Sequence, residues 1–170
     1  MRRIPSTPAR SLAGAISLAL AFTLAAAAAG RDRAADDDDA KALAVKLLTA
    51  GAAKFDAKDA PGLAATYTDD AVLTSVSRES GGTLKTEVYR GKADIEKVYN
   101  DHFKGDASFH ARNNVDYARH AGPDILIVGG VFEPDAQAAD PIKIPFVQVR
   151  VKQGDAWKIA NIQIFILTGK

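Results

Sequence analysis

The last part of the chain holds four successive segments with the pattern of β-strands, and this succession limits the folds that the sequence can adopt. The segments are SFHARNNVDYARH at 108–120, DILIVGGVFE at 124–133, IPFVQVRVK at 144–152 and AWKIANIQIFIL at 156–167. The first, third and fourth alternate along their length, and the second is more fully apolar. Because a short loop or turn separates each segment from the next, the order predicts a four-stranded antiparallel meander.

Three segments with helical spacing of apolar residues precede the meander, at 40–55, about 60–67 and 91–103. Between the second and the third, residues 71–90 have the character of a strand hairpin that turns at Gly81-Gly82. This order of elements is typical of an α+β fold. We expect a cone-shaped α+β barrel, in which three N-terminal helices pack on a curved, mostly antiparallel sheet.

The N-terminus has the parts of an export signal. Arg2, Arg3 and Arg10 precede an apolar run that is rich in alanine and ends in small residues before Gly30. We interpret residues 1–29 as a cleaved signal peptide and expect a periplasmic or secreted protein. The alternative is an uncleaved membrane anchor, because the run is nearly long enough to span a bilayer. Residues 30–39 are polar and acidic, and we predict a flexible tether in which Asp39 caps the next helix.

Composition narrows the possible partners of the remaining chain. The formal charge is +1, and the leader contributes three arginines and no acidic residue, so removing it leaves 1 − 3 = −2. This balance predicts neither nucleic-acid binding nor attraction to a membrane after cleavage. Cysteine is absent, so stability must come from an apolar core rather than from disulfides.

Four stretches together resemble the nuclear transport factor two-like superfamily, which includes ketosteroid isomerases and SnoaL-type polyketide cyclases. They are FDAKDAPGLAATYTDDAVL at 55–73, YRGKADIEKVYNDHF at 89–103, DILIVGGVFE at 124–133 and VQVRVKQGDAWKIANIQIF at 147–165. The resemblance implies one domain over 40–170. It implies the cone-shaped fold but no single function, because the superfamily supports enzymes, carriers and assembly domains.

The resemblance also assigns roles to the aspartates of the first stretch. It implies that Asp56 ends the long helix and that Asp59 caps the next one. It implies that Asp69 and Asp70 break this second helix and start the first strand. The four acids are therefore expected to be structural rather than catalytic.

The residues at the catalytic positions of ketosteroid isomerases do not support that chemistry here. Alignment on the four stretches places Gly51, Ser75 and Val147 where those enzymes carry a tyrosine, a base and an acid. A glycine has no side-chain donor, a serine at its free pKa is a poor base, and a valine cannot bind an oxyanion.

The same alignment predicts which residues face the interior of the cone. The inward apolar set is Leu126, Val128, Gly130, Phe132, Val147, Val149, Val151, Ala160, Ile162 and Ile164. Four polar residues are expected inside or at the mouth: Ser75, Tyr99, His102 and Asn113. Such a lining is typical of a small-molecule site. The alternative is that these residues fill one another's space and leave no cavity.

His102 and Tyr99 are the candidate catalytic residues, because they are three residues apart on one helical face. His102 could act as a base at neutral pH, with Tyr99 or Asn113 as a hydrogen-bond donor to a substrate carbonyl. The alternative is a helix-end histidine stabilised by the helix dipole. We predict no metal site and no cofactor, since the histidines are too far apart and nucleophile and phosphate-loop motifs are missing.

Three functions remain open from the sequence. The first is an exported domain that binds an apolar or amphipathic small molecule. The second is a SnoaL-like cyclase, dehydratase or isomerase that uses His102. The third is a dimerisation or docking module that uses the outer face of the sheet, with Arg112, Gln148, Arg150, Asn161 and Gln163. A homodimer through the sheet is compatible with all three.

Overall fold

The computed structural model describes residues 17–79, 81–105 and 108–167. The chain divides into two compact units, Met1–Ala35 and Asp36–Lys170. Helix α1 (Ser17–Asp56) begins in the first unit and ends in the second. Residues 1–16 of the predicted signal peptide lie outside the described residues. Within the described residues, no helix contains a stretch both apolar enough and long enough to span a bilayer.

The backbone of residues 30–39 is helical, where the sequence analysis predicted a tether. Asp39 therefore lies inside α1 and does not cap a helix, so this part of the prediction was wrong. No glycine or proline follows Gly30 before Gly51, and the alanines and lysines after Asp39 have high helix propensity. The four consecutive acids are thus compatible with a continuous helix.

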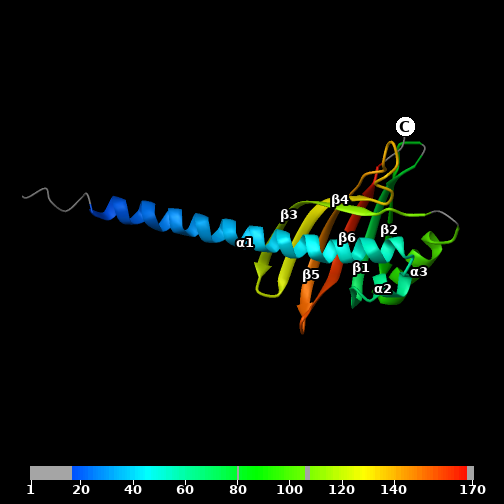
Figure 1. Cartoon of the computed structure of the whole chain (residues 1–170), viewed down its shortest axis with the longest axis horizontal. Coiled ribbons are helices and arrows are strands. Elements are labelled where there is room, and N and C mark those ends of the chain that lie inside the picture. Colours follow the sequence, from blue (N-terminus) through cyan, green and yellow to red (C-terminus); the bar gives the residue numbers. More distant parts are fainter. Residues whose placement is uncertain (1–16, 80, 106–107, 168–170) are drawn as a thin grey trace, which may run out of the picture. The chain divides into compact units, whose positions relative to one another are not determined.

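Six strands form one sheet in the second unit. They are β1 (Tyr67–Arg78), β2 (Leu84–Arg90), β3 (Arg112–Gly122), β4 (Ile125–Glu133), β5 (Ile144–Gln153) and β6 (Ala156–Ile166), in the order β2-β1-β6-β5-β4-β3. All neighbours are antiparallel except β1 and β6, which are parallel. The predicted meander and hairpin are confirmed, and Figure 1 shows the strands beside one another.

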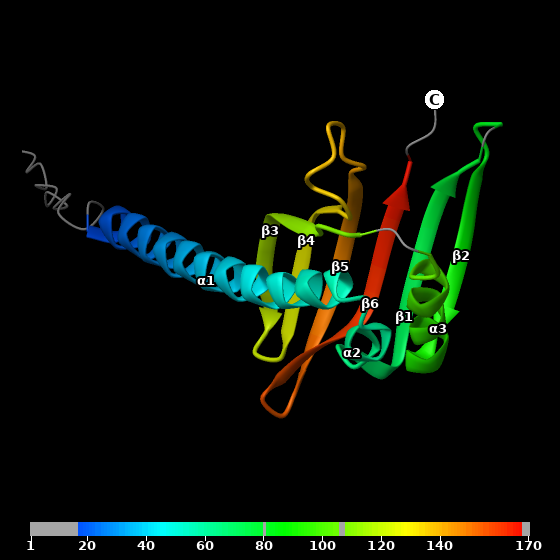
Figure 2. The ribbon, with the colours of Figure 1, turned by 45° about the vertical axis from the view of Figure 1, so that its right-hand side comes forward.

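Helices cover one face of this sheet in two places. Residues 36–56 of α1 cross β3, β4 and β5, while α2 (Ala60–Ala64) and α3 (Gly91–His102) lie near β1 (Figure 2). Ala40, Ala44 and Leu48 of α1 join one buried cluster with residues of β3, β4 and β5. Ile95 of α3 joins a second cluster with residues of β1 and β6. The fold is the predicted α+β arrangement, a curved open sheet with helices on its inner face.

The first pair of aspartates has the predicted structural role. Asp56 is the last residue of α1, and its side chain accepts a hydrogen bond from the backbone N–H of Ala111 at 2.7 Å. Asp59 is the N-cap of α2 and accepts a hydrogen bond from the backbone N–H of Gly62 at 2.9 Å. Both carboxylates satisfy backbone donors at points where the chain changes direction.

The second pair of aspartates corrects the prediction. Helix α2 ends at Ala64 rather than near Tyr67, so Asp69 and Asp70 do not end it. They lie within β1, where the pairing with β6 is irregular between Tyr67 and Val72. Asp69 forms an ion pair with Lys92 at 2.6 Å and so connects β1 to the first turn of α3.

Two glycines in β4 allow a close approach of β3. The pairing of these strands shifts between Val115 and Tyr117. A Cβ atom on Gly130 would lie 2.2 Å from the carbonyl oxygen of Asn114, and a Cβ on Gly129 would meet the ring of Tyr117. A glycine within a central strand often marks a bulge or a close approach of backbones, and Gly130 has this role against Asn114 although it does not line the cavity.

Gly130→Ala is therefore expected to destabilise the protein by about 1–3 kcal/mol, because the new methyl group must displace backbone atoms. Gly51→Ala is the matched control. A Cβ there meets nothing within 4 Å, and alanine in a helix interior should add about 0.5–1 kcal/mol. Equilibrium urea unfolding of the two variants measures both values. Equal stability of Gly130→Ala and wild type would contradict the proposed backbone contact.

Candidate functional site

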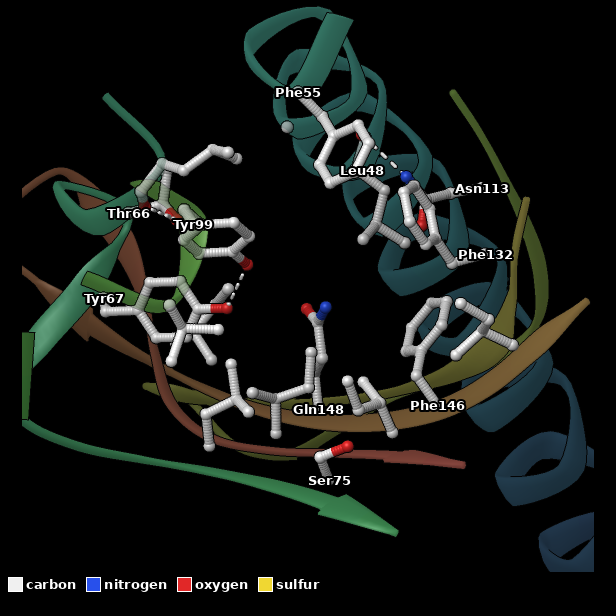
Figure 3. Close-up of a pocket in the computed structure, with 18 of the residues that line it drawn as sticks. Leu48, Phe55, Thr66, Tyr67, Ser75, Tyr99, Asn113, Phe132, Phe146 and Gln148 are labelled. Atoms are coloured by element: carbon white, nitrogen blue, oxygen red, sulfur yellow. Dashed lines mark hydrogen bonds between the residues drawn. The ribbon is translucent and has the colours of Figure 1, made fainter. Parts of the chain in front are cut away.

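A cavity of about 360 Å³ lies between the helices and the inner face of the sheet (Figure 3). Residues from α1, α2, α3 and all six strands line it, and most of them are aliphatic or aromatic. This volume is in the range of small-molecule sites. The alternative prediction, that the interior side chains fill one another's space completely, is therefore wrong.

Seven of the eleven predicted ligand-binding residues line this cavity: Ser75, Tyr99, His102, Asn113, Phe132, Ile162 and Ile164. Gly51, which the sequence alignment placed at the position of the isomerase tyrosine, also lines it. Val128 faces inward but is fully buried against α1 and not in the cavity. Gly130, Val147 and Val149 do not line it either.

Strand β5 has the opposite orientation to the one predicted. Phe146, Gln148 and Arg150 are buried and line the cavity, whereas Val147 and Val149 are only partly buried. Gln148 pairs with the inward Ile162 of β6, and Val149 pairs with Asn161. Directly opposite residues of paired strands share a face. Gln148 and Arg150 therefore belong to the site and not to the outer surface.

The orientation of β5 was predicted wrongly because its valines lie on the outer face and its polar residues face the cavity. The valines alternate with Gln148 and Arg150, and this pattern normally indicates apolar side chains inside and polar side chains outside. An alternating pattern gives the two faces of a strand but not which face is covered. For the same reason, Gln148 and Arg150 were assigned to the outer face rather than to the cavity.

A bulge in β6 explains the second difference. The pairing shifts between Val149 and Arg150 of β5, opposite Asn161 and Ile159. The extra residue is Ala160, so Ile159 rather than Ala160 lines the cavity. A bulge reverses the alternation of side chains along a strand. Ile162 and Ile164 lie beyond the bulge and face inward as predicted.

Two tyrosines form the polar part of the cavity wall. The hydroxyl groups of Tyr67 and Tyr99 lie 2.8 Å apart and form a hydrogen bond, and both rings face the cavity (Figure 3). Burial raises the pKa of Tyr67 well above its usual value, and it also raises the pKa of Tyr99. Both groups are therefore neutral donors at physiological pH. Tyr67 was not among the predicted site residues, because it was assigned to the end of a helix.

Arg150 lies at the same end of the cavity and is 4% exposed. Its Nε donates a hydrogen bond to Oε1 of Gln148 at 3.0 Å. Desolvation lowers the pKa of Arg150 to about 10, although the nearby tyrosines act in the opposite direction. The guanidinium therefore remains charged at neutral pH, beside the neutral polar groups of Gln148 and the two tyrosines.

His102 lies one turn further along α3 than Tyr99 and is more exposed than Arg150. Its ring is 5.5 Å from the ring of Phe109 in a stacked arrangement and 5.5 Å from the ring of Phe55. Burial among these aromatic rings lowers the pKa of His102 below its usual value. The neutral imidazole is therefore the main form at neutral pH, as a general base requires.

Asn113 has a structural partner. Its Nδ2 donates to the carbonyl oxygen of Leu48 in α1 at 3.2 Å (Figure 3). This bond joins β3 to α1. It uses the amide group that was expected to donate a hydrogen bond to a substrate carbonyl. Over the described residues, no three His, Cys, Asp or Glu side chains are placed to hold one metal ion.

Comparisons with known proteins identify the fold. No protein-family model and no curated protein sequence matches the chain. The chain is similar in structure to an NTF2-like protein of unknown function from Pseudomonas putida, with a TM-score of 0.57 and 15% identity over 76% of this chain and 88% of that one. An NTF-2 like protein of unknown function from Shewanella oneidensis gives 0.56 and 15%, over 71% and 94%. A ketosteroid isomerase-like protein from Erwinia carotovora atroseptica gives 0.53 and 20%, over 79% and 96%. At these identities the comparisons establish an NTF2-like fold.

The lowered pKa of His102 gives a prediction about stability. The unfolded chain takes up a proton near the ordinary histidine value of 6.5, and the folded chain does so only at lower pH. The contribution of His102 is thus present above 6.5 and is lost as the pH falls through the lower, folded value. His102→Asn should reduce the decline in unfolding free energy between about pH 8 and about pH 5.

Urea unfolding at several pH values measures this decline. His120→Asn is the control, because it removes a histidine that does not line the main cavity. If His102→Asn and wild type decline equally, burial does not restrict protonation of His102.

Proposed function

We propose that this protein is an exported binding protein that holds a small molecule with an apolar body inside the cone. The main support is the cavity of about 360 Å³, which has mainly aliphatic and aromatic walls and a few polar groups. Pockets with this composition commonly hold small organic ligands, with the polar groups fixing their orientation. The leader sequence supports export.

Catalysis is the second candidate function, and one observation favours it. His102 lines the cavity, and burial lowers its pKa so that the neutral form is available as a base. A SnoaL-like cyclase, dehydratase or isomerase could use it in this way. The scarcity of carboxylates in the cavity favours binding over catalysis. The one carboxylate lining the cavity within the described chain belongs to Glu87, which pairs with Lys85 at 3.0 Å.

We also propose that two copies associate through the outer face of the sheet. The outward residues of β5 are Val147, Val149 and Val151, and no helix of the described residues covers this face. Val88, Tyr117 and Ile125 on the same face are 46%, 46% and 40% exposed. An apolar surface that extends over several strands is typical of an interface between proteins.

Ligand binding is tested by thermal unfolding of the chain from Gly30 onward with steroids, aromatic polyketides, fatty acids and retinoids. A ligand at about 100 times its Kd should add about 2.7 kcal/mol to the free energy of unfolding. Gly51→Leu is expected to abolish the shift. The new side chain extends from α1 into open space in the cavity, and leucine favours the helix.

Ala50→Leu is the matched control, because Ala50 is the neighbouring residue and is exposed. It should melt like wild type and keep the full ligand-induced shift. Binding that survives Gly51→Leu would locate the ligand elsewhere. If no compound of the panel shifts the wild type, the proposed function is wrong.

The proposed dimer is tested by analytical ultracentrifugation of Val149→Glu. A carboxylate in the middle of the outer face should convert the dimer to a monomer, because it would be buried without a partner. Val45→Glu is the control, since Val45 is 47% exposed on α1 and away from the sheet. A wild type that sediments as a monomer at micromolar concentration would contradict the dimer.

A further inference from the structure

In the part of the chain that the structure describes, no negatively charged side chain pairs with the guanidinium of Arg150. No carboxylate of those residues lies within 4.0 Å of its guanidinium. Its one hydrogen bond there is the neutral one to Gln148. A second buried ionisable residue shows the usual arrangement. Glu133 is 3% exposed and accepts two N–H groups of Arg112, at 2.6 and 3.0 Å. Burying a charge without such a partner is costly.

The polar groups around Arg150 are donors. Gln148 uses Oε1 to accept from Arg150, so its Nε2 is left to donate, and its amide points into the cavity (Figure 3). The bond between Tyr67 and Tyr99 uses one of their two hydroxyl protons, and the other proton remains for a further acceptor. A guanidinium, an amide N–H and a phenol therefore surround one region, and all three complement an anion.

Glu87, the acid that lines the cavity, is not in a position to neutralise Arg150. Glu87 of β2 pairs with Ser75 of β1, Ser75 pairs with Ile164 of β6, and Ile164 pairs with Phe146 of β5, so Glu87 lies in the same cross-sheet row as Phe146. Arg150 lies four residues further along β5 than Phe146, which is about 13 Å for an extended strand. Glu87 also has its own partner in Lys85.

The cavity is closed at the Arg150 end and open at the other. Arg150, Tyr67 and Ile159 are 4%, 2% and 4% exposed. Ile144 and Ile166, at the other ends of β5 and β6, are partly exposed, and His102 of α3 is exposed. A ligand that enters from the exposed end would reach the guanidinium with its leading group, while its apolar part would remain against the isoleucines.

We propose that the cavity binds a monocarboxylic acid with an apolar body, with its carboxylate paired to Arg150 at the closed end. This proposal rests on the proposed binding function and specifies the class of ligand. A single negative charge matches the single guanidinium, and carboxylate oxygens match the fork of Arg150 and the adjacent amide and phenol donors. The body of the acid would contact the apolar walls toward the mouth.

The test compares acids with alcohols of the same carbon skeleton. Decanoate and decanol form one pair, and phenylbutyrate and phenylbutanol form another, with binding measured by calorimetry at neutral pH. Wild type should bind each acid at least about tenfold more tightly than its alcohol, which corresponds to about 1.4 kcal/mol. Arg150→Met should remove this preference but leave the alcohol affinity within a few fold.

Lys152→Gln is the matched control, because it removes one positive charge from an exposed position on the same strand. It should keep the full preference for acids. Arg150→Met should also melt no lower than wild type, since replacing an uncompensated buried charge with an apolar side chain removes a desolvation cost. If this variant does not fold, Arg150→Lys replaces it and should weaken the preference, because an ammonium lacks the planar fork.

The binding results distinguish failure of the carboxylate assignment from failure of the proposed binding function. Equal binding of acid and alcohol to wild type would overturn the carboxylate assignment and leave the binding function standing. An acid preference that persists in Arg150→Met would place the anion elsewhere and also overturn the assignment. Absence of binding by all four compounds, together with no hit in the wider panel, would overturn the binding function itself.

Discussion

The site depends on how one helix covers one face of the sheet. Ala40 and Ala44 of α1 are fully buried, and with Leu48 they pack against β3, β4 and β5. These side chains form one buried cluster with Ala118, Leu126, Val128 and Phe146, and this packing fixes the helix on the sheet. From Leu48 onward the same helix carries Gly51, Ala52 and Phe55, which line the cavity. Gly51 has no side chain to fill the space below it, so the helix forms a wall of the cavity.

The composition of the cavity wall follows from this geometry. Aliphatic residues of β1, β5 and β6 and aromatic residues from the helices provide an apolar lining, while Arg150, Gln148 and the two tyrosines form a donor-rich region at the closed end. An uncompensated guanidinium reduces the stability of the ligand-free protein. Such a cost is consistent with function when a ligand compensates it, because binding sites commonly contain groups that the fold alone would not favour.

The sequence predicted the order of the elements, because strand alternation, helical spacing and turn residues are local properties. Seven of the eleven ligand-binding residues that it predicted line the cavity, including Ser75, Tyr99 and Phe132. It missed the residues whose orientation depends on long-range pairing. The bulge at Ala160 brings Ile159 into the cavity, and the apolar outer face of β5 concealed Gln148 and Arg150. Neither could be recognised from an alternating pattern alone, since the pattern does not state which face the helices cover. Asp69 and Asp70 were misplaced for a related reason, because the irregular start of β1 is set by its pairing with β6.

The most direct test of this account is a crystal structure of the protein with bound decanoate. We expect the carboxylate to lie within hydrogen-bond distance of the guanidinium of Arg150 and of one tyrosine hydroxyl, with the alkyl chain directed toward Ile144 and Ile166. A decanoate in the reverse orientation, with its carboxylate near Ile144 and Ile166, or one bound outside the cavity, would contradict the account.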